Sequence, residues 1–251
     1  ISIEQNGCEA VSAQLVRVGN TYRMDFDALE ELASDPDITL MVLCNPQNPV
    51  GRVWSREELR RVGEICLRHG VTVVSDEIHC ELTAPCRAYV PFATVGDDVA
   101  RNSIVCVSPT KPFNMAGVKI ANIVIPDPTI RERVRRVVDR REIAGPGPFG
   151  IDALTAAYSR GGAEWIDELN VYIAGNYEFM REFVEKNLSD FPIMKLEGTY
   201  LVWMDCSALG MKSEDLEQAL KSDAKIWLNA GTMYGPGGEG YMRWNIACTR
   251  A

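Results

Sequence analysis

Polar side chains follow three apolar runs of the sequence, at the points where buried strands are expected to end. They supply amides, a carboxylate, an imidazole, a hydroxyl and an amine, and they are Asn45, Asn48, Asp76, His79, Ser108 and Lys111. In an open α/β sheet, ligands bind beyond the carboxyl ends of parallel strands, which meet at one edge. A lysine beside a carboxylate and an imidazole is the arrangement that Schiff-base chemistry uses, because such a lysine needs a tuned pKa.

Each of these residues taken alone has an ordinary explanation. Asn45 precedes a proline and is typical of a turn, Asp76 follows a strand and could cap a helix, and a single lysine is usually solvated. The joint arrangement at one edge is much harder to explain in that way. The sequence therefore favours a site over three unrelated loops.

The elements that would position these residues are parallel strands. Continuous apolar, β-branched runs occupy 38–44, 71–75 and 103–108, a pattern typical of a sheet covered on both faces. Between the first two runs, a helix is expected from the capping box of Ser55 and Glu58 onwards. Strand, helix and strand then form a βαβ unit with a right-handed crossover.

The next apolar run is expected to reverse direction. Only ten residues separate Ser108 from Lys119, and a parallel crossover needs about a dozen or more. The run 119–126 is therefore predicted to be antiparallel to its predecessor.

The second half of the chain has a different pattern. After the break GPGPFG (145–150), helices are expected over 151–160 and 164–188. Strands over 198–207, 224–229 and 240–248, and a helix over 213–222, follow them. We therefore expect an α/β fold with a mostly parallel sheet in residues 1–145 and a smaller α+β domain in residues 146–251.

Composition narrows the classes of partner. The net charge of −9 argues against nucleic acid and against an anionic membrane surface, and no apolar run approaches about 20 residues. Eight cysteines without a C-x-x-C pair indicate reduced thiols and a cytoplasmic protein. Cys80 and Cys86, with two histidines nearby, match no zinc spacing, so we expect no metal.

Four blocks of the sequence resemble a known family. NPQNPVG (45–51), SDEIHCEL (75–82), SPTKPFNMAG (108–117) and MRWNIACTR (242–250) look like the signature blocks of fold-type-I pyridoxal-phosphate (PLP) enzymes. They are most similar to the cystathionine β-lyase-like (C–S lyase) branch of the class I/II aminotransferases, and the resemblance extends over essentially all of the chain.

The resemblance implies a PLP-dependent enzyme that acts on small-molecule amino-acid substrates, as a C–S β-lyase or as an aminotransferase. Lys111 would form the aldimine with PLP and then move the α-proton. Asp76 would pair with the protonated pyridine nitrogen, and Arg243 would bind the substrate carboxylate.

The resemblance also implies the remaining cofactor contacts. Asn48 would bond the 3-oxygen of the ring, His79 would contact that oxygen or the ring itself, and Ser108 and Lys119 would lie at the phosphate. Pro112 departs from the family pattern and restricts Lys111 to extended backbone conformations.

The same resemblance implies that residues 1–145 form part of an incomplete PLP-transferase-like large domain. It also implies that the small domain, residues 146–251, lacks its last helix. The chain is therefore expected to be a fragment that lacks the N-terminal region, including a phosphate-binding glycine loop, and that is a homodimer in its full-length form. The alternative is a non-catalytic fragment or a ligand-sensing domain of the aminotransferase fold. A nicotinamide-dinucleotide domain is disfavoured, because no G-x-G-x-x-G follows the first strand.

Overall fold

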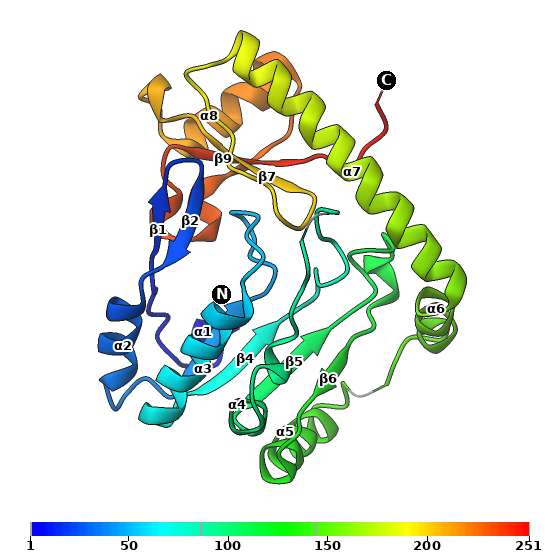
Figure 1. The fold of residues 1–251 in the computed structure, drawn as a ribbon. Coiled ribbons are helices and arrows are strands. Elements are labelled where there is room, and N and C mark those ends of the chain that lie inside the picture. The colour runs from blue at the N-terminus through cyan, green and yellow to red at the C-terminus, as the bar shows by residue number, and fades with distance from the viewer. Residues whose placement is uncertain (1, 86, 144, 251) are drawn as a thin grey trace.

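Two sheets and one long helix organise the computed structural model, which describes residues 2–85, 87–143 and 145–250 (Figure 1). The first sheet contains four strands in the order β3-β4-β5-β6, which are β3 (Leu40–Cys44), β4 (Thr72–Asp76), β5 (Ser103–Val107) and β6 (Asn122–Val124). Strands β3, β4 and β5 are parallel to one another, and β6 runs antiparallel to β5. The predicted direction of all four strands is confirmed.

Helix α3 (Arg56–His69) is the crossover between β3 and β4. The Ser55 hydroxyl accepts a bond from the Glu58 N–H at 3.1 Å, and the Glu58 carboxylate accepts one from the Ser55 N–H at 2.8 Å. This reciprocal pair satisfies two amide groups that the first turn leaves unbonded. The helix buries Leu59 and Val62 completely in the core beneath the sheet.

The other elements of the first half surround this sheet. They are α1 (Ser2–Gln5), β1 (Leu15–Val18), β2 (Thr21–Met24), α2 (Phe26–Ser34), η1 (Phe92–Thr94), α4 (Asp97–Arg101), η2 (Ala116–Val118) and α5 (Pro128–Arg140).

The second half is built on α7 (Arg160–Asn187), which runs from the first sheet to the second (Figure 1). Its other elements are α6 (Gly150–Ala157), β7 (Leu201–Asp205), η3 (Ser207–Leu209), α8 (Ser213–Ala219), η4 (Leu220–Ala224), β8 (Asn229–Ala230), η5 (Gly231–Tyr234), η6 (Pro236–Gly238) and β9 (Tyr241–Asn245). The second sheet is antiparallel, in the order β7-β9-β8.

The strand predicted over 224–229 is wrong for most of its length. A π-helical turn, η4, extends α8 to Ala224, and Lys225 follows it in the left-handed region at φ 57°. Strand β8 therefore begins only at Asn229. The apolar residues of this run failed as a strand signal because Ile226 and Trp227 are exposed and do not pack into the core.

The N-terminal hairpin β1–β2 contacts the second sheet, and Met24 of β2 also packs in the core of the first sheet. The Arg17 guanidinium bonds the Asp205 carboxylate and donates to the Tyr241 hydroxyl at 2.8 Å. Tyr22 packs in a buried cluster with Trp203. Figure 1 shows the hairpin beside β9. The division of the chain at residues 145 and 146 stays a prediction, and this hairpin reaches across it.

The expectation that both faces of the first sheet are covered is wrong for the described residues. Met41 and Leu43 pack on the α3 side, whereas Leu40 and Val42, on the opposite side of β3, are each 50% exposed. Successive side chains of a strand point to opposite faces, so one layer of helices covers only one of the two sets.

The composition predicted no membrane-spanning segment and reduced cysteine thiols. In the described ranges, no helix is long and apolar enough to cross a membrane. Cys66 and Cys206 are buried free thiols, and Cys8 and Cys248 are exposed free thiols. Cys86 lies outside the described residues.

Candidate active site

The carboxyl ends of β3, β4 and β5 meet at one edge of the first sheet. The Asn45 N–H donates to the Asp76 carbonyl at 2.9 Å, and the Glu77 N–H donates to the Cys106 carbonyl at 2.8 Å. These two bonds continue the parallel ladders one residue past the strands. They fix the starts of the loops that carry the polar residues singled out in the sequence.

Asp76 and Lys111 lie within electrostatic reach of each other at this edge. Burial raises the pKa of the half-buried Asp76 carboxyl, and the Ile78 N–H at 3.3 Å and the Lys111 charge oppose that rise. Within the described part of the chain, the Lys111 amine makes no hydrogen bond and no ion pair. Both side chains are therefore partly buried and incompletely hydrogen-bonded.

His79 is a buried, neutral imidazole. It is only 5% exposed, and burial lowers its pKa to about 4, with the charges of Lys111 and Arg243 acting in the same direction. Its ring meets the Tyr200 ring edge-on, with centroids 5.7 Å apart. Among the described residues, its buried Nδ1 atom has no hydrogen-bond partner.

Arg243 brings the second sheet to the same site. Its Nη1 donates to Asn48 Oδ1 at 3.0 Å, and its Nη2 donates to Asn229 Oδ1 at 3.1 Å. The guanidinium also lies over the Tyr234 ring, 4.6 Å from the centroid. Burial lowers the pKa of this arginine, and no carboxylate of the described residues pairs with it. A planar, half-buried cation held by neutral groups can accept the carboxylate of a ligand.

Ser108 and Lys119 are less closely joined to this group. The buried Ser108 hydroxyl donates to the Ile120 carbonyl at 2.6 Å and lies 2.7 Å from the Thr110 hydroxyl. Lys119 is exposed and in the left-handed region at φ 53°. No hydrogen bond found in the described ranges connects either residue to Lys111 or Asp76, so their phosphate role stays a prediction.

A buried carboxylate next to Asp76 holds the turn in place. Glu77 accepts bonds from the Ser75 hydroxyl at 2.7 Å, from the Phe92 N–H at 2.9 Å and from the Tyr89 hydroxyl. Burial raises the pKa of the Tyr89 hydroxyl, and the charge of Glu77 and its hydrogen bond with Tyr89 raise it further. Because both oxygens of Glu77 are satisfied, Glu77 is a structural anchor for the residues that follow β4.

The sequence analysis missed three residues that line this site, namely Tyr200, Asn229 and Tyr234. Tyr200 stands in the block EGTYLVWMD, but nothing in its spacing indicates contact with His79. Asn229 lies directly opposite Arg243 in the pairing of β8 with β9. That register could not be predicted once the strand before it was misplaced.

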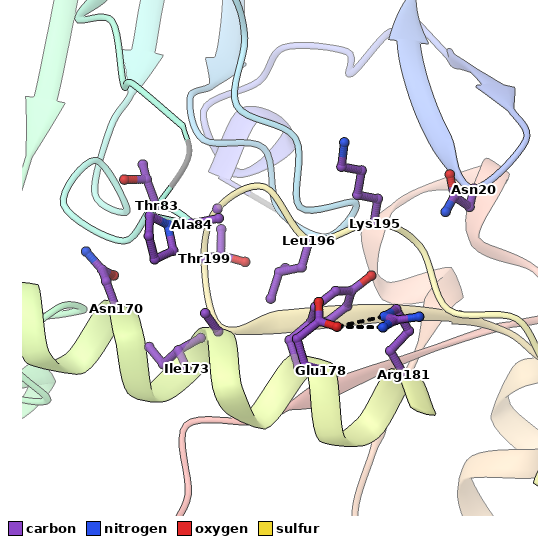
Figure 2. A pocket seen from close by; sticks show the side chains of 14 residues that line it. Asn20, Thr83, Ala84, Asn170, Ile173, Glu178, Arg181, Lys195, Leu196 and Thr199 are labelled. Carbon is purple, nitrogen blue, oxygen red and sulfur yellow. Dashed lines mark hydrogen bonds and ion pairs between the residues drawn. The ribbon is translucent and has the colours of Figure 1, made fainter. Parts of the chain in front are cut away.

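A cavity of about 380 Å³ lies away from this edge, between α7 and the loops that contain residues 83–85 and 195–199 (Figure 2). Ile173, Tyr177 and Leu196 line its apolar part. None of the site residues predicted from the sequence lines it, so it is separate from the site at the strand ends.

Comparison with known proteins gives two kinds of match. The family described as aminotransferase class I and II matches residues 3–251. The cystathionine beta-lyase PatB of Bacillus subtilis is 43% identical over 249 residues, which are 99% of this chain and 64% of that protein. The chain thus spans slightly less than two thirds of the length of this relative.

Solved structures give the same picture. Cystalysin from Treponema denticola, which contains a pyridoxal 5′-phosphate cofactor, superposes with a TM-score of 0.91 at 32% identity, over 98% of this chain and 62% of that one. The PLP-bound C–S lyase from Staphylococcus hominis superposes with a TM-score of 0.90 at 29% identity, over the same shares. The α/β fold predicted from the sequence is confirmed.

Protonation of His79 should destabilise the protein on acidification. Its pKa falls from 6.5 in the unfolded chain to about 4 in the fold, so the unfolded state binds the proton first. Stability from this residue is complete above pH 6.5 and is lost as the pH falls towards 4, with a full effect of about 3 kcal/mol. Urea unfolding without added ligand, at pH 7 and pH 4.5, should show a smaller pH-dependent loss in His79→Gln than in the wild type.

The matched control is His69→Gln, because His69 is the other histidine and pairs with Glu30 at the surface. The His69→Gln variant should still show the part of the pH-dependent loss of stability that His79 causes. Equal losses in the wild type and His79→Gln would contradict a buried neutral imidazole at this position.

Proposed function

We propose a PLP-dependent C–S β-lyase, starting from the fact that the chain belongs to the aminotransferase class I and II family. The observation that carries the proposal is the convergence of Lys111, Asp76 and His79 at the strand ends with the unpaired Arg243 facing them. Substrates would be small amino acids with sulfur on Cβ. The name of the PatB relative supports the lyase reaction.

The residues of the site fit PLP. The Asp76 carboxylate accepts one long bond, His79 Nδ1 is buried without a partner among the described residues, and the Lys111 amine is similarly unengaged within them. Buried polar groups normally find partners, so these three groups suit a ligand with complementary polar atoms. The proposed holders are Lys111, Asp76, Asn48, His79, Ser108 and Lys119.

PLP, when bound, withdraws electrons from the α-carbon of an amino acid. Lys111 would hold the cofactor's aldehyde and, once the substrate amine has released it, would accept the α-proton on Nζ as a general base. The Asp76 carboxylate would hold a proton on the pyridine nitrogen. In neutral His79, one ring nitrogen donates a hydrogen bond and the other accepts one, and the tautomer decides which.

Arg243 would bind the substrate α-carboxylate through its guanidinium fork. The side-chain oxygens of Asn48 and Asn229 accept from its two terminal nitrogens and so fix the plane of the fork. Tyr234 covers one face of that plane. The carboxylate thereby orients the α-carbon towards Lys111.

The second candidate function is an aminotransferase, which the description of the family supports. Both reactions begin with removal of the same α-proton. They differ in whether a leaving group departs from Cβ or the proton is returned to the cofactor. The comparisons support an enzyme over the non-catalytic, ligand-sensing alternative.

We extend the proposal to the location, the assembly and the domains of the whole protein. We place it in the cytoplasm, which the free thiols and the charge of −9 support. We propose a homodimer, which the exposed apolar residues Phe149 and Ile151 support. The division into a PLP-binding domain up to residue 145 and a smaller domain from residue 146 is part of the same proposal.

Substitution of Lys111 should abolish turnover. Lys111→Ala removes the proposed base, so kcat for a sulfur-containing amino acid such as cystathionine should fall by about a thousandfold or more. The control is Lys186→Ala, which removes an exposed lysine from α7 and should leave kcat unchanged. Product analysis separates the two reactions, because a lyase releases pyruvate, ammonia and a thiol. Formation of a keto acid with an aminated acceptor, and no thiol above background, would reject the lyase.

Shortening the fork of Arg243 should weaken substrate binding. Arg243→Lys keeps the charge but loses the two parallel hydrogen bonds, so KM for the amino acid should rise about 10- to 100-fold with a smaller change in kcat. Arg160→Lys, at an exposed ion pair on α7, is the matched control. An unchanged KM in Arg243→Lys would mean that the substrate carboxylate binds elsewhere.

A further inference from the structure

Three loops meet around the side chain of Glu197, next to the site but outside it. The described residues of these loops are 45–54, 82–85 with Arg87, and 195–200. Glu197 is only 2% exposed, although it carries a carboxylate. A buried carboxylate persists only where cations and donors surround it, so the partners of Glu197 are informative.

The partners of this carboxylate come from all three loops. Its Oε2 accepts from the Val53 N–H at 3.3 Å and lies 3.4 Å from Arg52 Nη1. Its Oε1 bonds the Arg87 guanidinium and lies 3.9 Å from Lys195 Nζ. Removal of the negative charge would deprive Arg87 of its carboxylate partner, whereas Arg52 would keep its ion pair with Glu58 at 2.8 Å.

Backbone bonds bring the loops into the same contact. The N–H groups of Glu197 and Gly198 both donate to the Gly51 carbonyl, at 2.8 and 3.1 Å. The Ala84 N–H donates to the Glu197 carbonyl at 2.8 Å. A Cβ atom on Gly198 would lie 2.7 Å from Val53 Cγ2, so a larger residue would push these loops apart.

The opposite side of the loop 195–199 borders a cavity and has one backbone bond there, from the Lys195 N–H to the Asn20 carbonyl at 2.8 Å. Figure 2 shows Lys195, Leu196 and Thr199 beside the cavity of about 380 Å³ that α7 closes from the other side. Empty space does not hold a loop in position. The Glu197 carboxylate therefore supplies the charged contacts that fix this loop, beside the backbone bond to Asn20.

Each of the three loops carries or adjoins a residue of the site. Asn48 lies in the first loop and accepts from Arg243, His79 stands three residues before the second, and Tyr200 ends the third and meets the His79 ring. We propose that Glu197 is a positioning residue, whose carboxylate sets the spacing of Asn48 and Tyr200 and through Asn48 the orientation of the Arg243 fork. This inference rests on the proposed function, in which Arg243 binds a substrate carboxylate.

The test compares Glu197→Gln with the wild-type holoenzyme by two independent measurements. Hydrogen–deuterium exchange of peptides covering 45–54 and 195–200 should rise about tenfold, with α3 unchanged, because local opening raises exchange locally. KM for the amino-acid substrate should rise about tenfold, with kcat within about threefold, because the fork is misplaced and the base is not. Glu178→Gln, which removes a carboxylate paired with Arg181 at the far side of the cavity, should change neither.

A second variant keeps the test decisive if Glu197→Gln does not fold. Arg87→Met removes one partner from a less buried position and should move both measurements in the same direction by a smaller amount. Unchanged exchange in both loops, or a uniform rise across the protein with kcat and KM equally affected, would overturn the positioning role. A wild type that turns over no amino acid would instead reject the proposed function, and loop exchange would still decide whether Glu197 positions the loops.

Discussion

The rest of the structure depends on the alignment of the carboxyl ends of β3, β4 and β5. Two consecutive strands are parallel only when a crossover carries the chain back to the edge where the first strand began. Helix α3 is that crossover between β3 and β4. The backbone bonds of Asn45 and Glu77 carry the ladder past the strands. Three loops with different polar residues therefore start from the same edge, and the second sheet adds Arg243 and Asn229 to the site.

The carboxylates and cations near this edge fall into two groups. Glu77 and Glu197 are buried and surrounded by donors and cations, and they hold loops together. Asp76, Lys111 and Arg243 are partly buried and have few or neutral partners among the described residues. Charged groups with few or neutral partners add no stability to the fold, because removing them from water costs more free energy than such partners give back. Their arrangement makes physical sense as a site prepared for a ligand that carries both an anion and polar ring atoms.

Local signals in the sequence predicted the first sheet well. The capping box of Ser55 and Glu58 and the short connection before Lys119 determine the helix and the reversal of β6 from neighbouring residues alone. The pairing of Arg17 with Asp205 could not be predicted in this way, because the two residues lie 188 positions apart. The contact of Asn229 with Arg243 depends on the register of β8, and Ile226 and Trp227 in the run before β8 are apolar but exposed. Asp76, His79 and Lys111, predicted by type and strand position, lie together, whereas Asn229 and Tyr200, which depend on distant contacts, were missed.

The central claim is that the Lys111 amine is presented to PLP by this edge of the sheet. The most direct measurement is an absorbance spectrum of the purified protein with PLP, followed by borohydride reduction and peptide mapping. The account predicts a long-wavelength band that reduction removes, with the cofactor attached to the peptide containing Lys111. Attachment spread over exposed lysines such as Lys186 and Lys212, or no band at all, would contradict it.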